Sequence, residues 1–286
     1  MLPRAKDEIT QVVASNVLVV LMYRRDPRKK WILTLTVPYP APSLTYNNSL
    51  FKPEMSEITV SPNAACVYCG SSPGTSAEYM QVAEAVGIAL AQAEIGLVYG
   101  GGRRGLMAGA AFACARAGGK VTGVLPQAIK ASGGEGIGPI LASNNNEDEA
   151  VWARMESIVV QSMHERKRTM AMRSGGFIGL PGGYGTFEEV LEVITWNQLG
   201  IHLKPVVIIN VRGYYEPLKL LIENGVREGF IKPANASLVT ILDPPANGDW
   251  GQAVIQALRT WKPDDGAGYK LNWGQTQPSK DSMDAI

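Results

Sequence analysis

Residues 181–189 hold the groups that could bind an anion and act on what is attached to it. The segment reads Pro-Gly-Gly-Tyr-Gly-Thr-Phe-Glu-Glu, after an apolar run at 176–180 and before the apolar spacing of a helix. Glycines let an anion approach the backbone, and the amides and dipole of a helix N-terminus favour phosphate. The spacing therefore predicts a phosphate cradle with a carboxylate about one helical turn away.

Two interpretations of Glu189 are open at this stage. Thr186 to Glu189 also matches a capping box, in which these two side chains would satisfy the first amides of the helix. In the other interpretation Glu189 acts on a ligand that the glycines hold. A second glycine-rich turn elsewhere in the chain favours the ligand.

That second turn contains Gly100, Gly102 and Gly105 and matches the dinucleotide-binding pattern G-x-G-x-x-G. The next strand-like run, 120–125, has no Asp or Glu at the expected distance of about 20 residues to bind a ribose. NAD is therefore disfavoured, and NADP binding would depend on Arg103 or Arg104. Arginines at a helix start oppose the dipole, which favours an anionic ligand nearby.

A basic run, Met-His-Glu-Arg-Lys-Arg, occupies residues 163–168. On a helix, Arg166 would point toward the sheet edge that holds the glycine turns. The alternative is an ordinary solvated basic face, because Arg and Lys are mostly exposed in proteins.

The elements that must position these residues alternate along the chain. Strands are predicted over 64–69, 96–99, 120–125, 157–161, 176–180, 205–210 and 238–242, and helices over 76–94, 104–117, 163–173, 185–198, 214–227 and 249–260. Such alternation is typical of a doubly wound, mainly parallel, Rossmann-like α/β sheet with helices on both faces, here in a single domain. Ligands bind such sheets beyond the carboxyl ends of the strands, so the glycine turns can share one cleft.

Composition indicates where the folded domain begins and ends and which classes of partner are disfavoured. The folded domain is predicted over 60–261, with an N-terminal extension at 1–59 that lacks order or is not native, and a disordered tail at 262–286. The polar stretch 131–149 is long enough to act as a lid. The apolar runs of the extension are too short to span a membrane. A net charge of +1 gives no basis for nucleic-acid or membrane binding.

Two histidines and three cysteines are too few for an obvious zinc cluster, and neither a metal nor a cofactor is expected. Cys66 and Cys69 form a C-x-x-C pattern inside a predicted strand. Their side chains would point to opposite faces, so we expect packing rather than redox chemistry. Thiols of this kind suit a reducing compartment such as the cytoplasm.

Taken together, these segments resemble the Lonely Guy family of cytokinin-activating phosphoribohydrolases. The resemblance rests on Met-His-Glu-Arg-Lys at 163–167, on the glycine-rich segment 181–189 and its continuation to 202, and on matching turns at 69–72 and 99–102. It covers residues 60 to 242, and its two motifs together are far more specific than G-x-G-x-x-G alone. Such proteins have been labelled lysine decarboxylases, but no pyridoxal site is recognisable here.

The resemblance implies hydrolysis of the N-glycosidic bond of a nucleoside 5′-monophosphate, with N6-prenylated adenosine monophosphates as favoured substrates. A broad purine nucleosidase that accepts AMP, or a non-catalytic nucleotide or cofactor carrier, are the alternatives. Arg166 and Glu189 match the family's catalytic pair, and a homodimer or higher homo-oligomer is implied. The expected substrate-binding positions are Ser71, Gly101, Gly102, Lys167, Gly182, Gly183, Tyr184, Gly185, Thr186, Glu188 and Thr195.

The chemistry fits these residue types. Breaking the C1′–N9 bond builds oxocarbenium-like charge on the ribose, which a carboxylate such as Glu189 can stabilise. Arg166 is expected to orient ribose or phosphate, because a guanidinium hardly releases a proton. The long stretch 131–149, the extension 1–59 and Arg168-Thr169 depart from the family pattern and bear on substrate range.

Overall fold

The computed structural model describes residues 10–14, 17–21, 37–38, 63–132, 151, 155–271 and 273. The chain divides into two units, Met1–Glu54 and Met55–Ile286. In the first unit, β1 (Thr10–Ala14), β2 (Val17–Leu21) and β3 (Val37–Pro38) form an antiparallel sheet. These strands lie within the extension that was expected to lack order, and their valine-rich sequences favour strand. Most of the predicted lid, from residue 133 onward, lies outside the described residues.

The second unit is built on a parallel sheet of seven strands, in the order β10-β9-β8-β4-β5-β6-β7. Its strands are β4 (Ala64–Tyr68), β5 (Gly96–Tyr99), β6 (Val121–Pro126), β7 (Glu156–Val160), β8 (Gly176–Gly179), β9 (Val206–Ile209) and β10 (Thr240–Leu242). The chain runs outward from β4 to β7 and then returns to the other side of β4 with β8. The doubly wound fold is therefore confirmed, with its topological switch point between β4 and β8.

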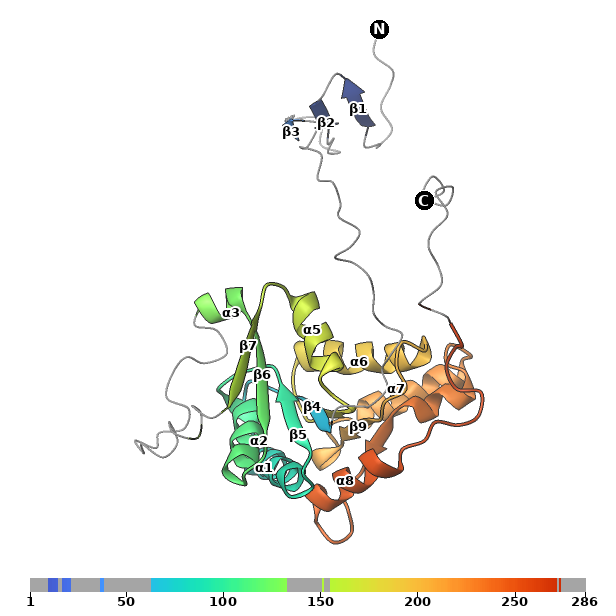
Figure 1. The fold of residues 1–286 in the computed structure, drawn as a ribbon. Coiled ribbons are helices and arrows are strands. Elements are labelled where there is room, and N and C mark those ends of the chain that lie inside the picture. The colour runs from blue at the N-terminus through green and yellow to red at the C-terminus, as the bar shows by residue number, and fades with distance from the viewer. Residues whose placement is uncertain are drawn as a thin grey trace. The chain divides into compact units, whose positions relative to one another are not determined.

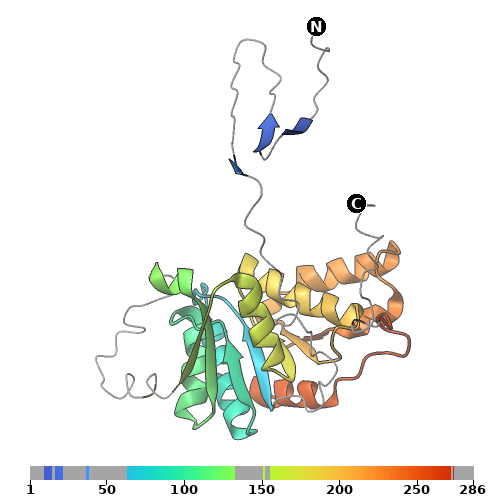
Figure 2. The ribbon, with the colours of Figure 1, turned by 45° about the horizontal axis from the view of Figure 1, so that its top comes forward.

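Helices cover both faces of this sheet (Figure 1). One face carries α1 (Ala77–Gln92), α2 (Gly105–Arg116) and α8 (Trp250–Thr260), and the other carries α5 (Met163–Met172), α6 (Tyr184–Gln198) and α7 (Glu216–Arg227). The turned view in Figure 2 shows the same layers. Three short elements were not predicted, namely α3 (Gln127–Ala131), η1 (Val211–Gly213) and η2 (Pro233–Leu238).

The helix starts differ in a way that matters for the site. Ser76, Ser162 and Asp249 cap α1, α5 and α8 by accepting a hydrogen bond from a backbone amide of the first turn. The two helices that follow the glycine-rich turns, α2 and α6, begin without a side-chain cap. Their first amides are therefore left for another acceptor.

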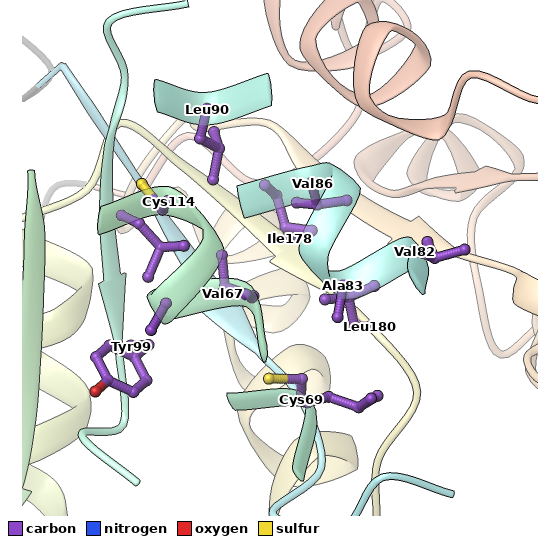
Figure 3. Close-up of a cluster of buried hydrophobic side chains, with 14 of the residues drawn as sticks. Val67, Cys69, Val82, Ala83, Val86, Leu90, Tyr99, Cys114, Ile178 and Leu180 are labelled. Carbon is purple, nitrogen blue, oxygen red and sulfur yellow. The ribbon is translucent and has the colours of Figure 1, made fainter. Parts of the chain in front are cut away.

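The buried side chains form one hydrophobic cluster on each face of the sheet. Figure 3 shows part of the first, which includes Val67 and Ile178 of the central strands and Val82 and Val86 of α1. This packing holds α1 and α2 against the strands whose carboxyl ends lead to the glycine turns.

The three cysteines are free and buried. Cys66 packs in the cluster under α5 and α6, whereas Cys69 and Cys114 belong to the cluster under α1 and α2. The opposite placement of Cys66 and Cys69 is therefore confirmed. Burial raises the pKa of Cys66, and it raises that of Cys114 to about 11, so both thiols stay protonated at neutral pH.

Part of the predicted disordered tail is ordered. The amide of Tyr269 donates to the carbonyl of Gln198 at 2.6 Å, and the indole of Trp273 donates to the carbonyl of Leu199 at 3.0 Å. Composition pointed to disorder here, but these bonds satisfy carbonyls at the end of α6 that have no partner inside the helix. None of the helices in the described part of the chain is long and apolar enough to cross a membrane.

Candidate active site

A cavity of about 350 Å³ opens at the carboxyl ends of the central strands. Its walls come from the end of β4, the turn after β5, and helices α2, α3, α5 and α6. The turns that follow β4 and β8 are joined by a 3.0 Å hydrogen bond from the Gly70 amide to the Pro181 carbonyl. The cavity therefore lies at the switch point, where an open α/β sheet binds its ligand.

The start of α6 forms one wall of this cavity through Gly183, Tyr184, Gly185 and Thr186. The first intrahelical bond runs from the Phe187 amide to the Gly183 carbonyl, at 3.0 Å. The amides of Tyr184, Gly185 and Thr186 therefore have no intrahelical acceptor and mark an anion-binding helix terminus.

The capping-box interpretation of Glu189 is wrong. Gly183 is the N-cap and makes no side-chain cap bond, so Thr186 is the third residue of α6 rather than its cap. Glu189 stands one turn further on, and it lines the cavity. The expected pairing of a helix terminus with a carboxylate on one cavity is present.

Glu189 also influences the phenol of Tyr68, which lines the same cavity. Burial raises the pKa of Tyr68 well above its usual value, and the nearby charge of Glu189 raises it further. The Tyr68 hydroxyl therefore keeps its proton and can donate a hydrogen bond beside the carboxylate.

Arg166 reaches the cavity from α5 and is only 5% exposed. Its Nη2 donates to the Gly100 carbonyl at 2.7 Å, and its Nε donates to the Val124 carbonyl at 3.2 Å. The interpretation as a solvated basic face is therefore wrong for this residue. A carbonyl within β6 and the carbonyl of the residue after β5 hold the guanidinium in place.

This arrangement also explains two glycines of the G-x-G-x-x-G pattern. A Cβ on Gly100 would lie 2.1 Å from Nη2 of Arg166. Gly105 has a φ of +55°, and a Cβ there would lie 2.4 Å from the Ser72 amide nitrogen. The Arg166 side chain thus occupies the space beside Gly100, and the backbone at residue 72 occupies the space beside Gly105. Contacts within the protein therefore account for Gly100 and Gly105 without a dinucleotide.

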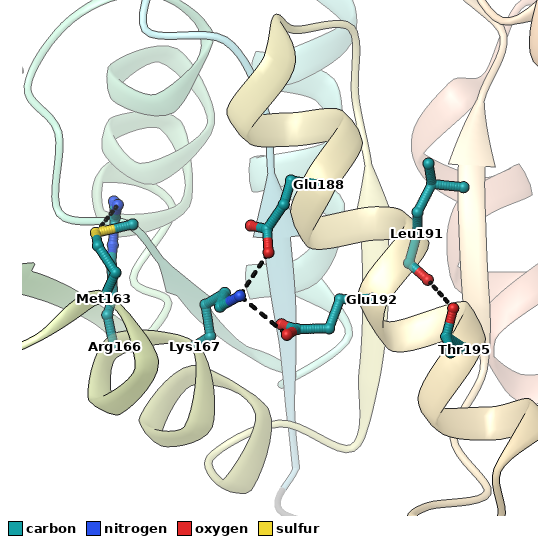
Figure 4. Close-up of polar contacts among 7 residues, drawn as sticks. All are labelled: Met163, Arg166, Lys167, Glu188, Leu191, Glu192 and Thr195. Carbon is teal, nitrogen blue, oxygen red and sulfur yellow. Dashed lines mark hydrogen bonds and ion pairs between the residues drawn. The ribbon is translucent and has the colours of Figure 1, made fainter. Parts of the chain in front are cut away.

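Lys167 does not line the cavity, but it forms an ion pair with Glu188, which does. Its Nζ lies 2.5 Å from Oε1 of Glu188 and 2.9 Å from Oε1 of Glu192, so that α5 and α6 are bridged (Figure 4). Burial disfavours the charge of Lys167, but the two carboxylates outweigh it and raise its pKa. Lys167 is therefore paired, and of these three residues Glu188 alone lines the cavity.

Thr195 does not line the cavity. It is exposed on α6, and its hydroxyl donates to the Leu191 carbonyl at 2.8 Å within the helix. The cavity brings together the predicted residues Ser71, Arg166, Gly183, Tyr184, Gly185, Thr186, Glu188 and Glu189. The predicted residues that do not line it are Gly101, Gly102, Lys167, Gly182 and Thr195.

Sequence reasoning missed several residues of the cavity wall. Met107, Ile129 and Met163 bring apolar side chains from α2, α3 and α5, and Tyr68 comes from the end of β4. Only their places at or after strand ends distinguish them from core residues in the sequence.

The cavity walls offer little to a metal or a pyridoxal cofactor. No lysine lines this cavity, so a Schiff base has no anchor among its walls. Within the described residues, no group of three His, Cys, Asp or Glu could hold a metal ion.

The chain is similar to one described family and to several named proteins. A family model described as "Possible lysine decarboxylase" matches residues 107–247. A probable cytokinin riboside 5′-monophosphate phosphoribohydrolase of Oryza sativa subsp. japonica is 40% identical over 77% of this chain and 82% of that protein. The cytokinin riboside 5′-monophosphate phosphoribohydrolase of Rhodococcoides fascians is 42% identical over 63% of this chain and 84% of that protein.

A third relative with the same activity in its name, from Arabidopsis thaliana, is 40% identical over 73% of this chain and 88% of that protein. Among solved structures, a molybdenum cofactor carrier protein from Chlamydomonas reinhardtii matches with a TM-score of 0.47 and 23% identity. That match covers 70% of this chain and 99% of the carrier.

Proposed function

This chain belongs to the family of cytokinin riboside 5′-monophosphate phosphoribohydrolases, and we propose that it hydrolyses the N-glycosidic bond of N6-substituted adenosine 5′-monophosphates. The products are the free base and ribose 5-phosphate. The observation that carries the proposal is the meeting of Glu189 with the uncapped start of α6 on one cavity. The sequence identity to the named relatives supports the same reaction.

The 5′-phosphate binds at the start of α6. The amides of Tyr184, Gly185 and Thr186 point along the helix axis toward the cavity, and the helix dipole adds positive potential there. Phosphate binding supplies energy remote from the bond that breaks. A nucleoside without the phosphate should therefore be a poor substrate.

Glu189 acts at the ribose. As the C1′–N9 bond breaks, positive charge develops on the sugar, and the carboxylate stabilises it. Water adds its oxygen to C1′, and its proton ends on the departing purine. Arg166 is fixed by the Gly100 and Val124 carbonyls and orients the nucleotide rather than giving up a proton.

The apolar part of the wall receives the base. Met107, Ile129 and Met163 offer methyl and thioether surface. An apolar N6 substituent is more stable against this surface than in water. A substrate with a prenyl group on N6 should therefore be preferred to AMP.

Separation of the products by chromatography tests the function. The protein is incubated in parallel with AMP, isopentenyladenosine monophosphate and isopentenyladenosine. We expect free base and ribose 5-phosphate from the prenylated monophosphate, less product from AMP and almost none from the riboside. Equal rates with AMP would indicate a broad nucleosidase. A complete lack of product would indicate that the protein is a non-catalytic nucleotide or cofactor carrier.

Glu189→Gln tests the chemical step. We expect kcat to fall about 100-fold or more with the fold intact, because one electrostatic stabiliser is lost. Glu192→Gln, one turn further along α6 and outside the cavity, is the matched control and should lose much less. Unchanged turnover in Glu189→Gln would return this residue to a structural role.

The proposal includes a homodimer in a reducing compartment such as the cytoplasm. Exposed apolar side chains continue along α6 and α7, with Leu191 45%, Leu220 56% and Leu221 64% exposed. Thr195 lies exposed on α6, one turn from Leu191, so a second copy docked there would meet it. The free, buried thiols support the compartment.

A further inference from the structure

Two adjacent tyrosines anchor the turn between β8 and α6. The Tyr215 hydroxyl donates to the Leu180 carbonyl at 2.8 Å, and the Tyr214 hydroxyl donates to the Gly182 carbonyl. Tyr215 is buried, whereas Tyr214 is 37% exposed. Both belong to the segment between η1 and α7, which neither the predicted site nor the proposed reaction uses.

The ring of Tyr214 is held from several sides. It stacks on Phe187 of α6 with ring centroids 6.4 Å apart and meets Tyr79 of α1 edge-on at 6.2 Å. It also meets the ring of Tyr215 edge-on at 5.0 Å. Burial and the neighbouring Tyr79 raise the pKa of Tyr214. Its hydroxyl therefore remains a donor at neutral pH.

Each of these anchors has a different consequence for the amide that follows it. In a trans peptide the carbonyl and the next N–H point in opposite directions, so a bond that fixes the carbonyl also aims that N–H. The bond to the Gly182 carbonyl aims the amide of Gly183, which lines the cavity. The bond to the Leu180 carbonyl precedes Pro181, which has no N–H to aim.

We propose that Tyr214 is a positioning residue of the phosphate subsite, where its hydroxyl holds the Gly182 carbonyl so that the Gly183 amide faces the 5′-phosphate. The proposal rests on the proposed function, because that function places the phosphate at this turn. Tyr215 holds the same turn but aims no amide. Its role is confined to stability.

The pair provides a matched experiment in the full-length protein. Tyr214→Phe and Tyr215→Phe each keep the ring and remove one hydroxyl. For Tyr214→Phe we expect KM for the prenylated monophosphate and the calorimetric Kd of ribose 5-phosphate to rise about tenfold, with kcat within about twofold. Tyr215→Phe should lower the thermal unfolding midpoint and leave KM and Kd unchanged.

Wild-type KM and Kd in Tyr214→Phe would overturn the proposal. So would equal increases in the two variants, because a general loosening of the turn would then explain both. The ribose 5-phosphate titration needs no turnover. If the wild-type protein hydrolyses no nucleotide but binds ribose 5-phosphate, the proposed function fails while the titration still tests Tyr214.

Discussion

Arg166 owes its place in the site to atoms far away in the chain. Its two carbonyl partners, Val124 and Gly100, are 42 and 66 residues distant in sequence. The helical period of a sequence predicts the direction in which a side chain points. It does not predict whether hydrogen-bond acceptors lie in that direction. Once two donors are bound to fixed carbonyls, the guanidinium becomes a rigid orienting group.

His202 is half-buried, and both nitrogens of its ring are buried. Its ring lies 5.1 Å from that of Phe177 and 6.2 Å from that of Trp196, and neither ring nitrogen has a hydrogen-bond partner in the described structure. Burial, and then the charge of Lys204, lower the pKa of His202 to about 3. In the unfolded chain a histidine titrates near about 6.5.

The pH dependence of stability follows from this difference. Between about pH 6.5 and pH 3, His202 binds a proton in the unfolded chain but not in the folded protein. The free energy of unfolding therefore decreases as the pH decreases. At pH 5 the loss from His202 is about 2 kcal/mol. In His202→Phe the new side chain fits between the same rings. Between pH 7 and pH 5 the free energy of unfolding of this variant, measured in urea, should decrease by about 2 kcal/mol less than that of the wild type.

His164→Gln is the control for that measurement, because His164 is exposed on α5. We expect it to behave like the wild type. An identical pH dependence in His202→Phe would show that His202 does not resist protonation in the folded protein.

At the scale of elements, the turn after β5 and helix α5 fit together because Gly100 has no side chain. In Gly100→Ala the new Cβ would occupy the place of Nη2 of Arg166, at 2.1 Å. The displaced atom ends a flexible side chain, so we expect a stability loss of only about 1 kcal/mol. Activity should fall at least about tenfold, because the orienting group moves.

A double-mutant cycle identifies the route of this effect. Arg166→Lys cannot reproduce the fork of donors and should also lose activity. If Gly100 acts through Arg166, Gly100→Ala combined with Arg166→Lys should be little worse than Arg166→Lys alone in kcat/KM. Additive losses would mean that the alanine disturbs the site by another path.

The elements themselves followed from local pattern, with small differences at their ends. The predicted helix at 185–198 begins at Tyr184, and the predicted strand at 238–242 is shorter because η2 takes up Leu238. The capping-box spacing was present without the capping box. The capping box does not form because Gly183 occupies the N-cap position. Thr186 therefore lies inside the helix and lines the cavity.

At the scale of the whole molecule, the exposed apolar side chains of α6 and α7 predict self-association. Sedimentation should give twice the mass of one chain. Leu191→Glu, on α6, places a charge on this face and should give monomers. Ile88→Glu is the control, because Ile88 is 40% exposed on α1 in the opposite layer. Dimers that survive Leu191→Glu would place the contact elsewhere.

The sequence by itself determined the alternating elements, the parallel sheet, the opposite faces of Cys66 and Cys69, and the glycine-rich wall that ends in Glu189. Each of these depends on residues close together in the chain, whose spacing sets helical or strand period. Such a pattern is readable without knowing which strands are neighbours.

Only the tertiary structure decided the membership of the cavity. It brought in Ile129 and Met163, left out Gly102 and Thr195, and buried Arg166 against carbonyls from two neighbouring segments of the sheet. These residues come from turns and helices that meet because β4 lies between β5 and β8. Strand order results from packing over the whole domain, and no local period encodes it.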